Sequence, residues 1–293
     1  MFKKNTFPPY LSVFYSIDGS RLEDTFNFVA MVVFPNCKIN LGLHIIGKRS
    51  DGYHELETVM FPVPMHDILE VVPSSSFHFE QSGTVVAGNL EDNICVKAFR
   101  LLELKYDISP VDMYLHKQLP MGAGMGGGSA DGTFALQALN AVMDLKLSTD
   151  ELIELSAQLG SDCPFFVRNT PQLAKGRGEI LTEVPVSLKG YYLALLHPPI
   201  HISTAEAFQG VHISGRSGEL EKLVQLPVTE WKGKLENDFE IHIFERYPAL
   251  SQAKEQLYED GAIYASLTGS GSVVYGIFDH PPKGYEMVIA IKD

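Results

Sequence analysis

Residues 120–131, with the sequence PMGAGMGGGSAD, constrain the fold of this chain more than any other segment. Five of the seven residues at positions 122–128 are glycine, so main-chain amides can approach a ligand closely and unusual dihedral angles cost little. A strand-like pattern at 111–115 precedes the loop, and an amphipathic helical pattern at 130–143 follows it. Main-chain amides and the positive end of a helix dipole then meet at one place, which suits an anion. We therefore predict that this loop binds phosphate groups.

Two common nucleotide motifs do not fit this loop. A Walker A sequence would end in Gly-Lys-Ser or Gly-Lys-Thr, and that ending is absent. A dinucleotide-binding loop would lie in the first turn of a βαβ unit, with an acidic residue about 20 positions later. A flexible turn without ligand is the plain alternative, but the strand before the loop and the helix after it favour phosphate binding.

Composition excludes several classes of protein. The 293 residues suffice for one large domain or two modest ones. The net charge of −13 disfavours non-specific binding to nucleic acid, whose phosphates attract basic surfaces. Cys37, Cys95 and Cys163 form no CxxC pair, which argues against disulfides and a zinc site and favours a reducing, cytoplasmic location. No apolar run approaches the roughly 18 residues that span a bilayer.

The first 30 residues differ from the rest. Lys3 and Lys4 precede a short apolar run at 11–17, but no small-residue cleavage site follows, so the signal-peptide pattern is weak. Met31 opens a strand-like segment. We therefore predict an N-terminal extension at residues 1–30.

Mixed strand and helix patterns fill the remaining chain. Strands are expected at 32–46, 57–72, 111–115, 165–167 and 191–196, and helices at 93–104, 130–143, 152–159, 236–244 and 250–259. Ser148 and Glu151 form a capping-box pattern, and a second glycine-rich turn lies within 265–278. Because strands and helices do not alternate strictly, the patterns indicate an α+β protein in two lobes. The boundary between the lobes is expected near residue 183.

Five segments resemble the GHMP kinase superfamily. PMGAGMGGGSADG is similar to its second motif and LTGSGSVVYGIF (267–278) to its third. FPNCKINLGLHIIGKRSDGYHELETV (34–59), LGSDCPFFV (159–167) and AKGRGEILTEV (174–184) resemble the branch that acts in the non-mevalonate isoprenoid pathway. That branch phosphorylates the 2-hydroxyl of 4-diphosphocytidyl-2-C-methyl-D-erythritol with ATP. The departures are small: Cys37 stands where alanine is usual, and Ala130 and Gly132 replace a serine and an alanine.

The resemblance implies a two-lobed fold. Residues 31–182 would form an ATP-binding, ribosomal-protein-S5-domain-2-like N-terminal lobe, and residues 183–293 a ferredoxin-like α/β C-terminal lobe. ATP and Mg²⁺ are the implied cofactors, without a dedicated protein metal site. A small-molecule substrate is the expected partner, and the chain is expected to be a monomer or a weak homodimer.

The resemblance also assigns the catalytic pair. Asp162 would accept the proton of the substrate hydroxyl, Lys38 would polarise that hydroxyl, and Asn40 would contact the substrate. From pattern alone, Asp162 would more often be a turn residue and Lys38 an edge-strand lysine extending to water. Lys38 lies in an otherwise apolar strand, where a buried ammonium needs a partner, and Asn40 is on the same face of that strand.

The remaining roles concern the two ligands. Tyr53 and Phe208 are expected to enclose the cytosine, His54 to hydrogen-bond its edge, and Thr204 to contact the substrate. Gly269 and Gly271 would bring the second turn near the substrate or phosphates. Ser129 would reach a phosphate or Mg²⁺. The expected nucleotide-binding residues are Asn93, Lys117, Pro120, Met121, Gly122, Ala123, Gly124, Met125, Gly126, Gly127, Gly128 and Ser129.

Two other functions stay open at this point. Another GHMP kinase, for mevalonate, homoserine or a sugar, would share the glycine loop, but the segment DGYH would have no base to bind there. A non-catalytic nucleotide- or RNA-binding module is the alternative from a different class. The net charge of −13 and the combination of Lys38 with Asp162 count against that module.

Overall fold

The computed structural model describes residues 30–84 and 88–292, together with the main chain of 11–15. Most of the predicted extension at 1–30 lies outside the described residues. The chain divides into two compact units, which are described separately. The first unit contains the chain up to Asn36, His66–Leu119 and Gly127–Arg168. The second contains Cys37–Met65, Pro120–Gly126 and the chain from Asn169 onward.

A five-stranded sheet forms one layer of the first unit, in the order β1-β2-β5-β7-β6. Neighbouring strands are antiparallel except β6 and β7, which are parallel. In this sheet Val71 pairs with Met31 on one side and with Met113 on the other, so β5 is a central strand. The strands are β1 (Leu11–Tyr15), β2 (Ala30–Val33), β5 (Ile68–Pro73), β6 (His78–Gly83) and β7 (Val111–Lys117).

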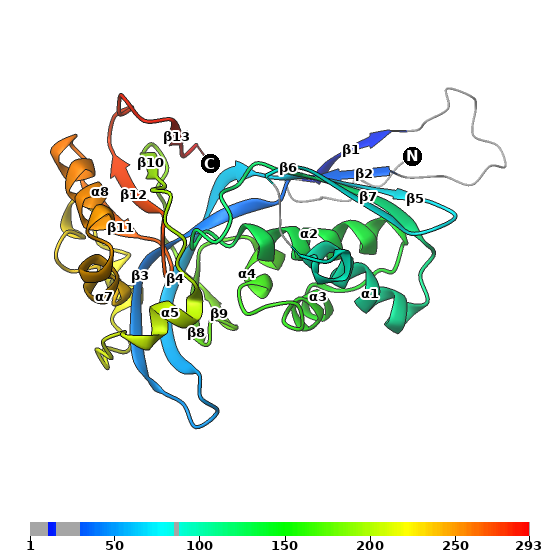
Figure 1. Cartoon of the computed structure of the whole chain (residues 1–293), viewed down its shortest axis with the longest axis horizontal. Helices are drawn as coiled ribbons and strands as arrows, with labels where there is room; N and C mark the ends of the chain where they lie inside the picture. The colour runs from blue at the N-terminus through cyan, green and yellow to red at the C-terminus, as the bar shows by residue number, and fades with distance from the viewer. Residues whose placement is uncertain (1–10, 16–29, 85–87, 293) are drawn as a thin grey trace. The chain divides into compact units, whose positions relative to one another are not determined.

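Helices cover one face of this sheet (Figure 1). The 16-residue helix α2 is the most buried, and it packs against β2, β5 and the other helices of the unit. The helices are α1 (Ile94–Tyr106), α2 (Gly127–Val142), α3 (Thr149–Ser156) and α4 (Cys163–Arg168), with a short 3₁₀ turn η1 (Leu90–Asp92). The predicted capping box before α3 is confirmed, because Ser148 and Glu151 exchange side-chain and main-chain hydrogen bonds.

One predicted element is wrong. Residues 165–167 were expected as a strand, whereas they lie within helix α4. The five residues Cys163 to Val167 are all buried, so the segment shows no polar face from which a helical period could be read. A short apolar run of this kind is compatible with either a buried strand or a buried helix, and its packing against α2 and α3 decides for the helix.

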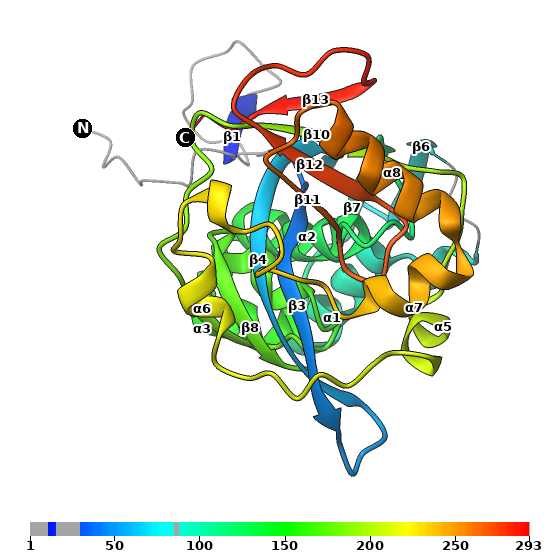
Figure 2. The same ribbon diagram turned by 90° about the vertical axis from the view of Figure 1, so that its left-hand side faces the viewer.

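The second unit contains two four-stranded antiparallel sheets. One has the order β3-β4-β8-β9, and its long strands β3 (Asn36–Lys48) and β4 (His54–His66) form a hairpin whose tip is the predicted turn (Figure 2). β8 (Gln172–Gly176) and β9 (Ile180–Glu183) complete it. The other has the order β11-β12-β10-β13, formed by β10 (Tyr192–Leu196), β11 (Tyr264–Leu267), β12 (Val274–Phe278) and β13 (Met287–Ala290).

Helices α7 (Phe239–Arg246) and α8 (Pro248–Glu259) lie beside β11 and β12 in both views (Figures 1 and 2). Leu250, Leu257 and Phe239 from these helices enter a core with Leu267 and Val274 from the strands. Shorter helices α5 (Thr204–Gln209), α6 (Leu220–Leu223) and the 3₁₀ turn η2 (Val228–Glu230) precede them. Trp231, after η2, is buried and donates its indole hydrogen to the carbonyl of Leu226 at 2.9 Å.

The predicted mixed α and β architecture in two parts is confirmed. The compact units are not continuous in sequence, however, and so differ from the predicted lobes 31–182 and 183–293. The β3–β4 hairpin accounts for part of the difference, because β4 pairs with β8 in the second unit. The predicted long strands are also each divided in two. Pro35, which has no amide hydrogen, separates β2 from β3, and Asp67 separates β4 from β5.

Candidate active site

In the second unit, Lys38 is buried in β3, with only 3% of its surface exposed. Its Nζ donates to Asn40 Oδ1 at 2.6 Å and to the carbonyl oxygen of Gly124 at 2.8 Å. The alternative of a lysine extending to water is therefore wrong. A buried ammonium is stable only with such partners, so this part of β3 is built to hold a positive charge against the glycine loop.

Thr268, in the second glycine turn, joins β3 to the loop. Its Oγ1 lies 3.2 Å from both Asn40 Oδ1 and the Gly124 carbonyl oxygen, and it accepts the main-chain hydrogen of Asn40 at 3.1 Å. The Asn40 amide also donates to Thr58 Oγ1 at 3.0 Å, which fixes its orientation. Sequence reasoning selected the glycines of the LTGSG segment and missed its threonine, although that threonine makes the polar contacts.

The glycine loop itself requires glycine at three alternate positions. Gly122, Gly124 and Gly126 have φ angles of 61°, 75° and 70°, a region that residues with a Cβ rarely adopt. A Cβ on Gly124 would lie 2.0 Å from the Thr268 carbonyl oxygen. The main chain of the loop is also bonded to β3, since Lys38 N–H donates to the Met125 carbonyl at 2.9 Å. The loop therefore has a definite conformation.

Gly127, Gly128 and Ser129 form the first turn of α2, in the first unit. A Cβ built on Gly128 meets no atom within 4 Å, and this residue is exposed. The first turn of a helix has main-chain amides without intrahelical partners and carries the positive end of the dipole. The helix start therefore offers space and donors for a phosphate group.

Asp162 lies in the same unit, half-buried and directly before α4. Thr133 Oγ1 lies 2.8 Å from the carbonyl oxygen of Cys163 and 3.0 Å from that of Ser129, so α4 is tied to the first turn of α2. A Cβ on Gly160 would lie 4.0 Å from Ser129 Oγ. The structure thus brings the Asp162 segment beside Ser129. Lys38 belongs to the other unit, and its pairing with Asp162 stays a prediction.

The predicted base-binding residues have aromatic and cationic neighbours in the second unit. The ring of Phe208 stacks on His54, with centroids 4.6 Å apart and planes inclined by 16°. Tyr53 is 56% exposed, and the Arg177 guanidinium lies 5.0 Å from its ring centroid. Each ring therefore has a neighbour of its own, and the enclosure of a base between Tyr53 and Phe208 stays a prediction. Arg177 was missed, although its position in the GRGE segment was within a recognised motif.

His54 and the short helix α5 carry further detail. Burial, followed by the charge of Lys48, lowers the pKa of His54, so its ring is neutral at pH 7 and can accept a hydrogen bond. Ser203 caps α5 by accepting the Glu206 main-chain hydrogen at 3.1 Å. Thr204, the first residue of α5, is exposed.

Asn93 and Lys117, the predicted adenine-site residues, have structural partners within the first unit. Asn93 caps α1 by accepting from Cys95 N–H at 2.9 Å. Lys117 is buried, and its Nζ lies 2.5 Å from Asp67 Oδ2 and 2.6 Å from Asp131 Oδ2. Burial acts to lower the pKa of Lys117, but the two carboxylates outweigh it and raise the pKa. The side chain of Lys117 is therefore engaged inside the unit.

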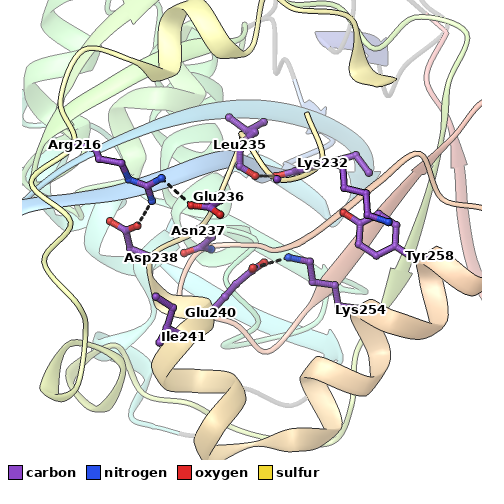
Figure 3. Close-up of a pocket in the computed structure, with 12 residues that line it drawn as sticks. Arg216, Lys232, Leu235, Glu236, Asn237, Asp238, Glu240, Ile241, Lys254 and Tyr258 are labelled. Atoms are coloured by element: carbon purple, nitrogen blue, oxygen red, sulfur yellow. Dashed lines mark hydrogen bonds and ion pairs between the residues drawn. The ribbon is translucent and has the colours of Figure 1, made fainter. Parts of the chain in front are cut away.

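A cavity of about 330 Å³ in the second unit contains none of the predicted residues (Figure 3). Five of its six charged side chains form ion pairs: Arg216 binds Glu236 and Asp238, each at 2.7 Å, and Lys254 binds Glu240 at 2.6 Å. Two of its polar residues instead support the second glycine turn. The remaining lining residues are Lys232, Gly233, Leu235, Ile241, Tyr258 and Tyr264.

The support of that turn comes from Asn237 and Glu240. The Asn237 amide donates to the carbonyls of Leu267 and Gly269, both at 2.9 Å. Glu240 Oε1 accepts from the main-chain N–H of Leu267 at 2.8 Å. The turn that carries Thr268 is thus held by three long-range hydrogen bonds from two side chains, which no local pattern in the sequence reveals.

Three expectations of composition can be compared with the structure. Cys37, Cys95 and Cys163 are buried thiols without a disulfide. Within the described ranges, no group of three or more His, Cys, Asp or Glu residues is placed to hold a metal ion. The described helices likewise include none that is long and apolar enough to cross a membrane.

Comparisons with known proteins agree with the motifs. The family models described as GHMP kinases N terminal domain and GHMP kinases C terminal match residues 93–169 and 219–291. A 4-diphosphocytidyl-2-C-methyl-D-erythritol kinase from Parabacteroides distasonis is 45% identical over 86% of this chain and 93% of its own length. One from Azobacteroides pseudotrichonymphae is 48% identical, with 86% and 94% coverage.

Solved structures show the same relationship. A crystal structure of 4-(cytidine 5'-diphospho)-2C-methyl-D-erythritol kinase superposes with a TM-score of 0.74 at 29% identity, covering 86% of this chain and 91% of that one. A homoserine kinase from Cytophaga hutchinsonii shares only the fold, with a TM-score of 0.62, 16% identity, and 88% and 87% coverage. The chain therefore belongs to the GHMP kinases and, within them, to the family of 4-diphosphocytidyl-2-C-methyl-D-erythritol kinases.

Proposed function

We propose that this protein transfers the γ-phosphoryl group of ATP to the 2-hydroxyl of 4-diphosphocytidyl-2-C-methyl-D-erythritol, a step of non-mevalonate isoprenoid synthesis. The names of its relatives at 45% and 48% identity support this substrate. The observation that carries the proposal is the glycine loop that leads into the open first turn of α2 at Gly128. Phosphoryl transfer depends mainly on positioning and charge stabilisation, and this loop supplies amides for both.

In this proposal the nucleotide lies along residues 120–129, with its phosphates against the first turn of α2. Asn93 and the main chain at Lys117 border the adenine, because the Lys117 side chain is already paired. Mg²⁺ usually keeps several waters and binds phosphate oxygens with few protein ligands, and the hydroxyl of Ser129 in the first turn of α2 would reach a phosphate or this ion. When bound, the ion neutralises charge on the transferring phosphoryl group.

The chemical step is assigned to Asp162 and Lys38. Asp162 accepts the proton of the attacking hydroxyl, a role in which a positioned carboxylate typically contributes about 10²–10⁴-fold. Lys38 polarises that hydroxyl and offsets the charge that develops. Asn40 orients the substrate, and its fixed contacts with Thr58 and Thr268 support that role.

The cytidyl group is assigned to the region of Phe208. Cytosine stacks on this ring, His54 hydrogen-bonds its edge, Tyr53 closes the other side, and Thr204 contacts the substrate. For this to occur Tyr53 must leave the Arg177 guanidinium and His54 must leave the Phe208 ring. Both movements are local, because Tyr53 and His54 lie at the tip of the β3–β4 hairpin.

A coupled assay for ADP release tests the substrate. We expect turnover with ATP and the cytidyl substrate, and none above background with mevalonate, homoserine or a simple sugar. Preference for one of those three would reassign the chain's activity within the GHMP kinases. ATP binding without turnover of any substrate would favour a non-catalytic module.

A pair of glycine variants tests the nucleotide site. Gly128→Ala adds a methyl group where the protein leaves open space, so folding is preserved and helix propensity improves. If phosphates occupy that space, the KM for ATP rises. Gly47→Ala is the control, because its Cβ also meets nothing within 4 Å and it lies in β3. Equal KM values for ATP in wild type and Gly128→Ala would rule out this placement of the phosphates.

We also propose a cytoplasmic location and a monomer or weak homodimer. Three buried thiols suit a reducing compartment, where ATP is also available.

A further inference from the structure

Asp67, Lys117 and Asp131 form a buried ionic cluster in the first unit. Their side chains are 0%, 2% and 3% exposed, and Lys117 Nζ lies between the two carboxylates at 2.5 and 2.6 Å. Asp67 lies between β4 and β5, Lys117 ends β7, and Asp131 is in the second turn of α2. The cluster therefore joins three segments that are 50 and 14 residues apart in sequence.

The second oxygen of Asp67 binds the chain just before the glycine loop. Asp67 Oδ1 accepts the main-chain hydrogens of Gln118 at 2.6 Å and Leu119 at 2.9 Å. Asp67 thus holds three consecutive residues that lead into the loop at Pro120. Asp131 holds the same lysine from the helix that follows the loop.

The two ends of the loop lie close together beside this cluster. A Cβ on Gly127 would lie 3.4 Å from Leu119 Cβ and 3.7 Å from Lys117 Nζ. Leu119 and Gly127 both belong to the first unit. The residues directly before and after the segment 120–126 therefore lie near each other, and the ionic cluster lies beside them.

A loop this rich in glycine needs such a constraint. Glycine has more conformational freedom to lose than any other residue, and a ligand that must first order a flexible loop binds more weakly. Stability alone gives a poor reason for the cluster, because buried ion groups can often be replaced by apolar residues without loss.

We propose that Asp67, Lys117 and Asp131 are positioning residues that clamp the base of the glycine loop and so preset its amides for ATP. This inference rests on the proposed binding of ATP at the loop. None of the three side chains needs to touch the nucleotide. They act through the main chain at Gln118 and Leu119 and through the start of α2.

Two substitutions of Asp131 distinguish the effect of its hydrogen bond to Lys117 from the effect of its charge. Asp131→Ala removes the acceptor and leaves Lys117 neutralised by Asp67. Asp131→Asn removes the charge but keeps an oxygen that can accept from Lys117 Nζ. We expect the dissociation constant for ATP to rise about tenfold in Asp131→Ala, the loss typical of one hydrogen bond to a charged group, and to stay within about twofold in Asp131→Asn.

The measurements are calorimetry with ATP, the KM for the cytidyl substrate, and hydrogen exchange of the ligand-free protein. Amides at 118–130 should exchange faster in Asp131→Ala than in wild type or Asp131→Asn, and the KM for the cytidyl substrate should not change. Leu139→Ala is the matched control: it removes a buried side chain of α2 that lies about two turns beyond Asp131, away from the loop. It should lower stability without weakening ATP binding.

Any of three results would overturn the clamp. The first is that Asp131→Ala binds ATP and exchanges its loop amides as the wild type does. The second is that Asp131→Asn loses as much ATP affinity as Asp131→Ala, and the third is that Leu139→Ala does so. A wrong nucleotide site would give a different set of results. Gly128→Ala would then bind ATP normally, whereas faster hydrogen exchange of the loop in ligand-free Asp131→Ala would still support the clamp.

Discussion

Replacing Gly124 by alanine perturbs the point where the glycine loop, β3 and the second glycine turn meet. The added Cβ would lie 2.0 Å from the Thr268 carbonyl oxygen, and real Cβ contacts essentially never fall below 3.0 Å. One side must therefore move by at least 1.0 Å. Thr268 cannot yield freely, because its N–H donates to the Val273 carbonyl at 3.0 Å and its carbonyl accepts from Gly271 N–H at 3.0 Å.

The magnitude follows from two costs. A residue with a Cβ in the left-handed region, here φ +75° at Gly124, costs about 1–2 kcal/mol. The movement also breaks the 2.8 Å bond from Lys38 to the Gly124 carbonyl, and a hydrogen bond to a charged group contributes about 1.5–3 kcal/mol. We expect Gly124→Ala to lose about 2.5–5 kcal/mol of unfolding free energy and, because Lys38 loses a fixed partner, to lower kcat.

Urea denaturation and steady-state kinetics measure the two effects, and Gly128→Ala, at the start of α2, is the control for stability alone. Gly128 has open space and no positive φ, so alanine there should leave the unfolding free energy unchanged or slightly higher. A loss in Gly124→Ala below about 1 kcal/mol, with wild-type kcat, would show that the loop does not press on the second turn as described.

The other predictions concern the chemical step and the base site. Asp162→Asn should lower kcat by about 10²–10⁴-fold while both substrates still bind; a kcat above about a tenth of wild type would make it a structural turn residue. Lys38→Met should also lower kcat, and the double variant should be little worse than Asp162→Asn, because the pair acts as a unit. Phe208→Ala and Tyr53→Ala should each raise the KM for the cytidyl substrate by the equivalent of about 1–3 kcal/mol and leave the KM for ATP unchanged; equal effects on both substrates would contradict the assignment.

Local patterns in the sequence were enough to predict several helices, a helix cap and the glycine loop. The helices around Phe99, Leu139 and Leu257, the capping box at Ser148 and the glycine loop before α2 all follow from short-range periodicity and backbone chemistry. These features depend on residues within a few positions of one another. Family motifs added roles for Lys38 and Asp162 that periodicity alone would not have assigned.

Only the tertiary structure decided the contacts between distant segments. Lys117 was predicted to meet the nucleotide, yet its side chain lies between Asp67 and Asp131, and no pattern along the chain indicates this triple contact. The stacking of His54 on Phe208 likewise joins two residues that are far apart in the chain. Long-range pairing, burial and the choice between adjacent side chains depend on how whole elements pack, and the local sequence does not contain that information.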